Sequence, residues 1–590
     1  MAKARRAVSH KQDKLSRRRV RWANRWHARR AARARPATGF VSQPEPRTIG
    51  SFARGKQLVS GNFLFAGHHV TDEAASIWQI TPPSPSFAEE VQGFTWLDDL
   101  ASLGDLEARR RAQAWLAEWI ALYGGGKGPG WTPDLTGRRL IRWINHALFL
   151  MSGQEGDESF DFFRSLGQQT IFLSKRWQAA SPGLPRFEAL TGLIYAGLSL
   201  TGMEAHVDPA MQALARECAD QIDAEGGIPT RNPEELLEVF TLLNWAASAL
   251  SEAGRMAAGE HLAAIERIAP TLRALRHSDG GLARFHGGGR GLEGRLDHAL
   301  ATSGVRASVN VGLSMGYARL SAGRSSIIMD AAAPPPGAAS VNAHASTLAI
   351  EVTSGRRPLI VNCGSGAHFG EAWRRAGRAT PSHSTLGIEG LSTARLGPPE
   401  TVDGVARSLI VEAPRDVRIQ HIAEDGLSGF VAGHDGYLLS HGLTHIRRIE
   451  LSVDGRDIRG EDTLAAIGEA DQQLFSQALD RVALQGIAYS IRFHLHPDVD
   501  AELDLGGTAV SMALKSGEIW VLRFDGVGEL TLESSVYLEK NRLKPRATKQ
   551  VVLSGVAMDY ATRIRWSLAK AQDTPSAIRD LEREDPAGLP

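Results

Sequence analysis

The chain changes its hydrophobic periodicity once, and this change constrains the fold more than any other feature. From about residue 95 to 275, apolar residues recur at spacings of three and four, as in "WLDDLASLGDLEARRRAQAWLAEWIALYG", a pattern typical of amphipathic helices. From about residue 305, segments such as "STLAIEV", "SLIVEA" and "THIRRIELSV" are rich in alternating apolar and β-branched residues, and Gly, Asp and Asn turns separate them. The pattern predicts a helical domain followed by an antiparallel β-sandwich.

The length of 590 residues agrees with two large domains, because one hydrophobic core does not serve a chain of this size. The Gly-rich stretch near 280–305 is the natural boundary between them. We predict four parts: a basic N-terminal arm over 1–48, a helical domain over 49–300, a β-sandwich domain over 301–572 and a C-terminal tail over 573–590.

The N-terminal arm concentrates positive charge. Residues 1–40 contain 14 Lys and Arg against the single acidic residue Asp13, a balance of +13, so the rest of a chain with net charge +1 sums to −12. An arm of this composition is expected to be disordered and to contact anionic surfaces such as nucleic acid or anionic lipid. Because it lacks a core-forming apolar pattern, we expect the fold to survive its removal.

The sequence leaves the compartment open. No apolar segment follows the arginines of the arm, so no conventional export signal is evident. No run of 18 or more apolar residues occurs, and no membrane-spanning segment is expected. Cys218 and Cys363 lie far apart and form no CxxC pattern, so they indicate neither a metal site nor a redox environment.

Five segments of the second half occur together in an order that is informative: "GYARLSAGRSSIIMD", "NAHASTLAIEVTSGRRPLIVNCGS", "RATPSHSTLGIEG", "HDGYLLSHGLTHIRRIEL" and "RFHLHPDV". This half resembles the heparinase II/III-like family of polysaccharide lyases, and "RRLIRWINHALFL" extends the resemblance loosely to the helical half. The resemblance implies an (α/α) toroid followed by an antiparallel β-sandwich. It also implies an acidic, uronate-containing polysaccharide as substrate and the cell envelope or periplasm as compartment, with the cytoplasm as the alternative.

Lyases of this family act by β-elimination, in which a base removes the proton beside a uronate carboxylate and an acid protonates the leaving oxygen. By resemblance, the catalytic candidates are Asn342, His344, His383 and Tyr437. Asn342 stands where the family has its catalytic histidine, and an amide does not transfer protons at neutral pH. We therefore expect weak lyase activity at most, dependent on His344 or His383 together with Asn342. A glycan-binding or envelope protein that keeps the cleft without the chemistry is the alternative.

His344 and His383 also match positions that hold a structural metal in some members of the family, and Asn362 stands where that set has an aspartate. These three residues are the candidate ligands of a zinc ion, although an uncharged amide is a weak substitute for a carboxylate. We expect no cofactor, with zinc as the alternative. The two histidines are equally compatible with a structural role, as buried residues whose ring nitrogens are hydrogen-bonded within the floor of a cleft.

Positively charged groups in the helical part are candidates for binding an acidic sugar. Guanidinium groups pair bidentately with carboxylates, so Arg186 and Arg231 are predicted to bind substrate, with His146 as a further candidate inside a helix. The stretch "HGGGRG" at 286–291 lacks the preceding strand and the following GK[ST] of a phosphate-binding loop. It is predicted to be a flexible linker.

Overall fold

The computed structural model of this protein describes residues 18–571, except for 35–36, 43–44, 74–75, 155, 307–311, 403–404, 425, 527 and 541. The predicted tail over 573–590 and the first 17 residues of the arm lie outside the described residues. Two compact units are present. Of the described residues, those from 18 to 223 together with 238–267 form the first unit, and 224–237 together with 268–571 form the second.

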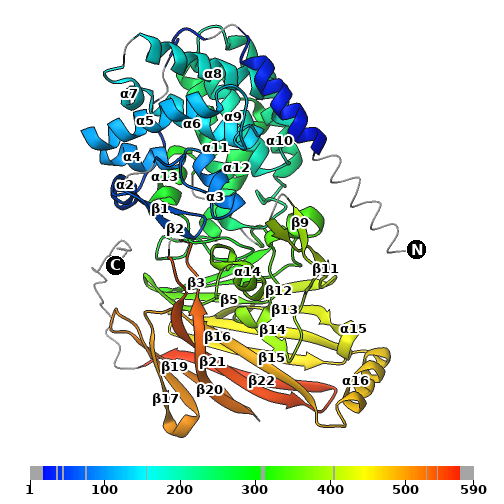
Figure 1. Ribbon diagram of the computed structural model, residues 1–590. Coiled ribbons are helices and arrows are strands. Elements are labelled where there is room, and N and C mark those ends of the chain that lie inside the picture. Colours follow the sequence, from blue (N-terminus) through cyan, green and yellow to red (C-terminus); the bar gives the residue numbers. More distant parts are fainter. Residues whose placement is uncertain are drawn as a thin grey trace. The chain divides into compact units, whose positions relative to one another are not determined.

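The first unit is built from helices (Figure 1). Their bounds are 18–31, α2 (Phe52–Val59), α3 (Pro85–Gln92), α4 (Trp96–Leu103), α5 (Leu106–Tyr123), α6 (Pro133–Asn145), α7 (Ala147–Met151), α8 (Asp157–Arg176), α9 (Leu184–Ser199) and α10 (Val207–Gln221), followed by most of α11 (Pro233–Glu252) and the first part of α12 (Gly259–Ala274). A short hairpin of β1 (Asn62–Phe65) and β2 (His68–Thr71), which the periodicity did not predict, also belongs to this unit.

Local sequence signals explain where these helices begin and end. Gly104 ends α4 in the left-handed conformation, and the side chain of Asp105 then caps α5 by accepting a hydrogen bond from the backbone of Ala108 at 2.8 Å. Helices α6 and α9 approach closely because each carries a glycine at the contact. A Cβ on Gly192 would lie 2.4 Å from the Cα of Gly137, so no larger residue fits there without moving a helix.

The core of the first unit is aromatic and encloses the guanidinium of Arg139. The indole rings of Trp96, Trp119 and Trp143 are nearly inaccessible to solvent. The guanidinium of Arg139 lies 4.2 Å from the ring centroid of Trp119, and its Nε donates to the side chain of Gln169 at 2.7 Å. A cation–π contact and a directed hydrogen bond thus replace the water that this arginine loses on burial.

The helix over residues 18–31 corrects the prediction that the whole arm is disordered. Asn24, Ala28 and Ala31 are buried and follow one another at spacings of four and three, so they form one face of the helix. Nε of Arg176 donates to Oδ1 of Asn24 at 2.7 Å, and the side chain of Gln168 donates to the carbonyl of Ala28 at 3.1 Å. Small residues let this helix dock closely on α8, a signal that charge composition conceals.

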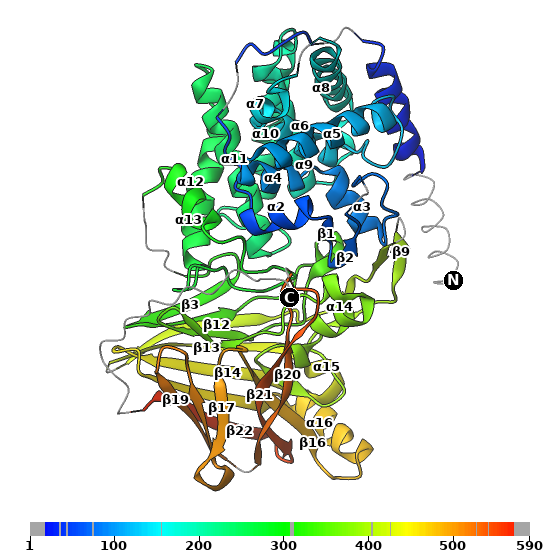
Figure 2. The ribbon, with the colours of Figure 1, turned by 60° about the vertical axis from the view of Figure 1, so that its left-hand side comes forward.

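The second unit contains two antiparallel sheets that face each other (Figure 2). One sheet has the strand order β12-β13-β14-β15-β22-β19-β18-β17 and the other β20-β21-β16-β6-β5-β4-β3, with β7 paired to β16. The strand bounds are β3 (Tyr317–Ala322), β4 (Ser325–Asp330), β5 (Ile350–Ser354), β6 (Arg357–Val361), β7 (Leu386–Ile388), β12 (Val417–Glu424), β13 (Leu427–Tyr437), β14 (Leu443–Ser452), β15 (Asp457–Ala465), β16 (Ile487–Leu495), β17 (Asp500–Asp504), β18 (Ala509–Ala513), β19 (Ile519–Asp525), β20 (Glu529–Tyr537), β21 (Arg546–Ala557) and β22 (Ala561–Lys570).

Three helices accompany these strands, namely α13 (Arg295–Thr302), α14 (Glu371–Gly377) and α16 (Glu469–Arg481), together with a single turn, α15 (Leu438–His441). Four short strands form two small antiparallel pairs, β9 (Glu400–Val402) with β10 (Val405–Arg407) and β8 (Arg395–Leu396) with β11 (Ile410–Glu412). Along β14, buried and partly exposed residues alternate without a break, as expected for a strand with one face on the core.

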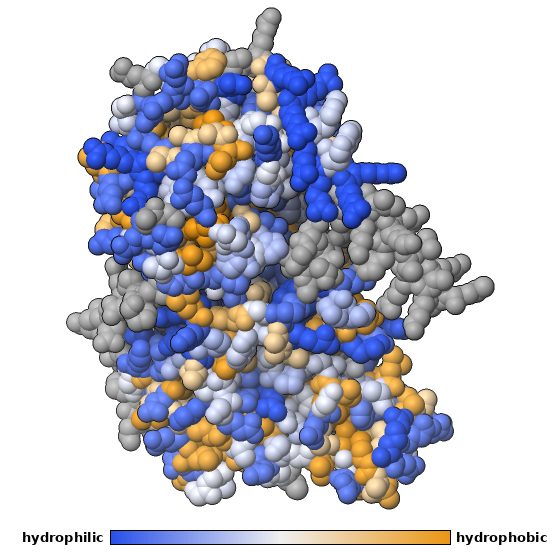
Figure 3. All heavy atoms as spheres, viewed as in Figure 1, coloured by the Kyte–Doolittle hydropathy of each residue, from blue (hydrophilic) through white to orange (hydrophobic). Residues whose placement is uncertain are grey.

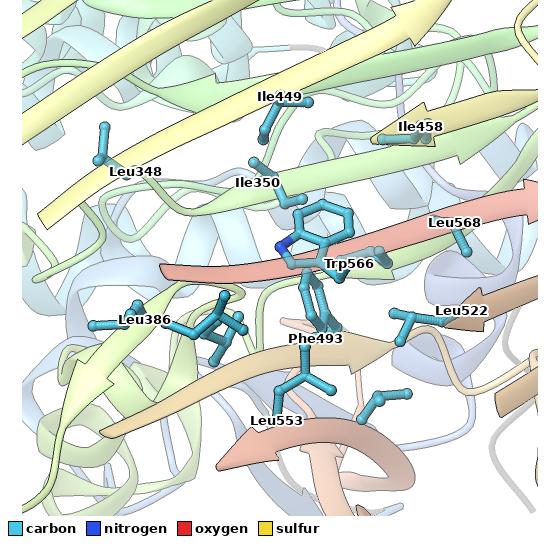
Figure 4. Packing of buried hydrophobic residues seen from close by; sticks show 14 of the residues in the cluster. Leu348, Ile350, Leu386, Ile449, Ile458, Phe493, Leu522, Leu553, Trp566 and Leu568 are labelled. Atoms are coloured by element: carbon cyan, nitrogen blue, oxygen red, sulfur yellow. The ribbon is translucent and has the colours of Figure 1, made fainter. Parts of the chain in front are cut away.

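The core of the second unit lies between the two sheets (Figure 4). Phe493 of β16 and Trp566 of β22 come from opposite sheets, and their ring centroids are 4.8 Å apart. Leu348, Ile350 and Ile449 are also completely buried in this cluster. Contact between the inward faces of the two sheets defines a β-sandwich.

No helix in the described part of the chain combines the length and the apolar character that crossing a bilayer requires.

Candidate functional site

The two histidines singled out by the sequence lie beside each other in the second unit. His344 follows the 3₁₀ turn η3 (Gly337–Asn342), and His383 follows the 3₁₀ turn η5 (Thr380–Ser382). Nδ1 of His344 is 3.0 Å from Nε2 of His383, and Nδ1 of His383 is 2.9 Å from the carbonyl oxygen of Ala379. Because a carbonyl only accepts, His383 carries its proton on Nδ1, and its Nε2 accepts the Nδ1–H of His344.

A third histidine, His286, joins this pair through the backbone. The N–H of His344 donates to Nδ1 of His286 at 3.1 Å, so the proton of His286 is on Nε2. That Nε2 lies 3.4 Å from Oδ2 of Asp330 and has no well-aligned hydrogen bond. His286 begins the stretch "HGGGRG", which is therefore a packed loop of the site and not the flexible linker predicted from its glycines.

Asp330, at the end of β4, is the anionic centre of the network. It is completely buried, accepts from NH2 of Arg231 at 2.6 Å and accepts from Oγ of Ser346 at 2.6 Å. Burial alone would raise the pKa of Asp330, but the charge of Arg231, the neighbouring His286 and the hydrogen bond from Ser346 hold it well below its usual range. The carboxylate is therefore ionised near neutral pH.

Arg231 serves this network and has no donor left for a substrate carboxylate. Besides Asp330, its guanidinium donates to four backbone carbonyls, those of Met315, Gly316, Ala332 and Ala333, at 2.8–3.3 Å. These bonds explain why residues 224–237 belong to the second unit although the periodicity placed them in the helical domain. The geometry assigns Arg231 a structural role in place of the predicted substrate-binding role.

Backbone strain gathers around the same carboxylate. Arg231, His286, Met315 and Leu348 all have φ between 47° and 62°, a region that residues other than glycine rarely adopt. The N–H of Leu348 donates to the carbonyl of Asp330 at 2.8 Å. Such conformations persist only where surrounding contacts over-determine them, which marks this network as a constrained site and not as ordinary loop structure.

Burial sets the protonation state of the paired histidines. Burial, and then the neighbouring imidazoles of His383 and His286, lower the pKa of His344 well below its ordinary value. Burial lowers the pKa of His383 from 6.5 to about 4. Both rings are therefore neutral near pH 7, as their shared hydrogen bond requires.

The three candidate metal ligands do not fit a zinc ion. Oδ1 of Asn362 accepts from the backbone of Ser384 at 2.9 Å, and its Nδ2 donates to Oε1 of Glu351 at 3.3 Å, so the amide is already engaged on both sides. The remaining candidates are the two imidazoles, and Nδ1 of His344 and Nε2 of His383 are used in their mutual hydrogen bond. Across the described ranges, no group of three His, Cys, Asp or Glu side chains is arranged to hold a metal ion.

Asn342 and Tyr437 have opposite environments. Asn342 is exposed, and its Oδ1 accepts from Arg374 at 3.3 Å. Tyr437 is completely buried in the core of the sandwich, where its hydroxyl donates to the carbonyl of Leu386 at 3.2 Å. Burial raises the pKa of Tyr437 above its ordinary value, so the phenol stays protonated and enclosed. Tyr437 cannot reach a substrate from this position.

One arginine of β14 fixes the two loops that carry the histidines. NH1 of Arg447 donates to the carbonyls of Leu348 and Ser384, each at 2.9 Å. The rest of its guanidinium is paired with Asp462, at 2.7 Å from Nε to Oδ1 and 3.1 Å from NH2 to Oδ2. Sequence reasoning missed this residue, although an arginine in a buried alternating position of "THIRRIELSV" is itself a signal of an internal partner.

The remaining two substrate-binding candidates lie in the first unit and are paired internally. NH1 of Arg186 lies 2.9 Å from Oε2 of Glu217, and its NH2 donates to the carbonyl of Ala180 at 3.0 Å. Nε2 of His146 is 2.9 Å from Oδ1 of Asp98, and the ring is buried. Both side chains therefore have structural partners, and whether either contacts a ligand stays a prediction.

The outward face of helix 18–31 is a second candidate surface. Trp22 and Trp26 are 68% and 43% exposed, and they lie on the side opposite the buried face. Exposed arginines flank them at positions 18, 19, 21, 25, 29 and 30, and no acidic residue interrupts the series. Figure 3 shows the resulting hydrophilic stripe at the upper right, where this helix runs in Figure 1.

Comparison with known proteins identifies the family. Residues 305–567 match the family described as Heparinase II/III-like, C-terminal. The FtsZ-localized protein C of Caulobacter vibrioides is 30% identical over 564 residues, which cover 92% of this chain and 92% of that protein. The chain belongs to the heparinase II/III-like family.

Solved structures of lyases share the fold at low sequence identity. A crystal structure of heparinase III aligns with a TM-score of 0.64 and 13% identity, covering 92% of this chain and 88% of that one. A heparan sulfate lyase of Pedobacter heparinus aligns with a TM-score of 0.56 and 13% identity, covering 93% of this chain and 88% of that one. These matches confirm the predicted (α/α) toroid followed by a β-sandwich. At such identities they establish the fold alone.

Proposed function

We propose that this chain is a heparinase-fold protein without lyase chemistry at its histidine site, and that it localises with FtsZ at an anionic membrane surface. One observation carries the first half of the proposal. Of the four catalytic candidates, only Asn342 presents its side chain to solvent, whereas His344, His383 and Tyr437 are buried and hydrogen-bonded. β-Elimination needs a proton acceptor that reaches the substrate, and an amide is not one.

The tyrosines support the same proposal. The chain has seven, and Tyr195, Tyr317, Tyr437, Tyr489 and Tyr537 are buried. Of the other two, Tyr123 is partly buried and Tyr560 is exposed. The hydroxyl of Tyr560 lies near Ser476 of α16, an element that contributes nothing to the histidine network. The acidic polysaccharide expected from the family resemblance is therefore not the substrate in this proposal.

Similarity to the FtsZ-localized protein C supports the second half. The alignment covers 92% of this chain and 92% of that protein, so the greater part of both the helical part and the sandwich is shared. Localisation with FtsZ would place the chain in the cytoplasm, which is the alternative to the envelope compartment suggested by the lyase resemblance. Two exposed tryptophans among arginines on helix 18–31 are suited to the interface of an anionic lipid bilayer.

Three experiments test the proposal. Purified protein is incubated with heparin, alginate and other uronate polymers while ultraviolet absorbance reports the unsaturated product, and we expect none above the buffer rate. A fluorescent fusion of the chain is imaged with labelled FtsZ, and we expect coincident bands at the division site. The variant Trp22→Ala/Trp26→Ala should bind vesicles of anionic lipid less well than the wild type. Robust elimination by the wild type, or a fusion spread evenly through the cell, would contradict the proposal.

A further inference from the structure

Positive charges meet where helix 18–31 docks on the end of α8. Lys175 and Arg176 are the last two residues of α8, and helix 18–31 brings His27 and Arg30 beside them. Lys175 and Arg30 are exposed, while His27 and Arg176 are partly buried. The hydrogen bond from Arg176 to Asn24 joins the two helices at this point and fixes the guanidinium next to the imidazole.

Among the described residues, no opposite charge lies beside these cations. In the part of the chain that the structure describes, no carboxylate lies within ion-pair distance of Lys175, Arg176 or Arg30. Burial, and then the charges of Arg176, Arg30 and Lys175, lower the pKa of His27. Gathering like charges in a partly buried place is unfavourable unless an anion accompanies them.

The end of a helix favours cations, and this alone would explain Lys175 and Arg176. The preference of a helix end for cations does not explain why a second basic helix docks here and brings His27 and Arg30 to the C-terminal end of α8. Ala28 and Ala31 pack the helix, but they fix only which face is buried. Two independent elements therefore contribute cations to the surroundings of His27, which is an arrangement suited to binding an anion.

We infer that Lys175, Arg176, His27 and Arg30 bind a phosphate group. A planar guanidinium and a flexible ammonium are the side chains that proteins use most for phosphate oxygens. At a membrane the phosphate belongs to the headgroup of an anionic lipid, and Trp22 and Trp26 would enter the interface beside it. The biological source of the phosphate rests on the membrane association proposed above, whereas the binding of a phosphate group does not.

The test uses the full chain with two probes. Glycerol 3-phosphate is titrated by calorimetry, and vesicles of phosphatidylcholine with or without phosphatidylglycerol are used in flotation. The site variant is Arg30→Gln/Lys175→Gln, which leaves the bond between Arg176 and Asn24 in place. The matched control is Arg110→Gln, which removes an exposed charge of α5. Each lost cation near an anion weakens binding by about fivefold, so the site variant, which lacks two, should bind both probes about 25-fold more weakly.

The outcomes separate the two proposals. Unchanged binding of glycerol 3-phosphate by Arg110→Gln, with weak binding by the site variant, supports the site. The variant Trp22→Ala/Trp26→Ala should lose vesicle binding and keep the affinity for glycerol 3-phosphate. The inference is overturned if the wild type binds no glycerol 3-phosphate. It is also overturned if Arg110→Gln binds as weakly as the site variant, because net charge alone would then govern binding. A wild type that binds glycerol 3-phosphate but not vesicles keeps the site and refutes the membrane association.

Discussion

His344 donates its Nδ1–H to Nε2 of His383 across 3.0 Å, and this bond uses the last free nitrogen of His383. The other nitrogen of His383 already donates to the backbone of Ala379. A general base needs a lone pair that faces the substrate, so His383 is a structural member of the network in this arrangement. The pair occupies positions that the family resemblance marks as functional, but its hydrogen bonds serve the loops.

Replacing His383 should therefore affect stability before any activity. The substitution His383→Ala leaves the Nδ1–H of His344 buried without a partner and opens a cavity, and the free energy of unfolding should fall by about 2–4 kcal/mol. Urea unfolding followed by circular dichroism measures this change. Asn342→Ala, at an exposed position of the same site, is the control and should stay within about 0.5 kcal/mol of the wild type. Equal stability of the two variants would contradict the network.

The stability of the protein should fall with acidification, in part through His383. An unfolded histidine takes up its proton near the ordinary pKa of 6.5, whereas folded His383 does so only at about 4. Between these values the unfolded chain binds more protons, so stability rises with pH there and the contribution is complete above pH 6.5. Over the whole window it amounts to roughly 3 kcal/mol. The free energy of unfolding of His383→Gln, measured from pH 4.5 to 7.5, should depend on pH less steeply than that of the wild type.

Removing Arg231 should be among the most damaging single changes in the second unit. Arg231→Met leaves the carboxylate of Asp330 buried without its main counter-charge and deprives four backbone carbonyls of their donor. The free energy of unfolding should therefore fall by about 3–5 kcal/mol. Differential scanning calorimetry gives the fall in melting temperature. The comparison is Arg395→Met, which breaks the solvent-exposed pair with Glu412 and should leave the melting temperature nearly unchanged. Similar melting temperatures of these two variants would be incompatible with the buried network.

Zinc should not be a component of the purified protein. The amide of Asn362 is engaged by Ser384 and Glu351, which leaves two nitrogen ligands where a structural zinc ion needs four ligands in all. Elemental analysis should find no stoichiometric zinc, and the melting temperature should not change in the presence of a chelator. One zinc per chain together with a fall in melting temperature on chelation would show that the loops rearrange to take up the metal.

The docking of helix 18–31 is open to a direct test. Ala28 is completely buried where the helix packs on the rest of the first unit. Ala28→Glu therefore forces a charge into this contact. It should lower the free energy of unfolding by about 2–3 kcal/mol or expose the helix to proteolysis. Arg25→Glu changes charge more strongly but lies on the exposed face, and it should leave the melting temperature nearly unchanged. If Ala28→Glu behaved like Arg25→Glu, the helix would not be docked in solution.

Periodicity was sufficient to predict the architecture. Spacings of three and four in the first half and alternation in the second half reflect the geometry of helices and strands, and β14 repeats the predicted alternation over its whole length. The helix at 18–31 was not predicted, because its buried face consists of Asn24, Ala28 and Ala31, which carry almost no hydropathy signal. The Gly-rich loop of His286 was misread for a related reason: glycine permits a tight, packed turn as readily as a flexible linker.

The site was predicted in position but not in environment. Family resemblance brought His344 and His383 together, and they are in contact. It could not show that Arg231 and Tyr437 face inward, because the direction of a side chain in a loop or at a strand end depends on contacts far away in sequence. Asp330, the centre of the network, belongs to the segment "GYARLSAGRSSIIMD" that contributes to the family resemblance. The residues next to it in sequence give no sign that it forms a buried ion pair.

The guanidinium of Arg447 ties the backbone after His344 to the backbone after His383, so the two loops form a single mechanical piece. An attempt to convert this chain into a lyase by exchanging one residue, such as Asn342→His, would place a histidine on a scaffold shaped for other side chains. Both loops would have to be transplanted together, with carbonyls positioned to receive Arg447. The same coupling keeps both loops in shape whichever residue stands at position 342, because the hydrogen bonds that hold them belong to the sandwich itself.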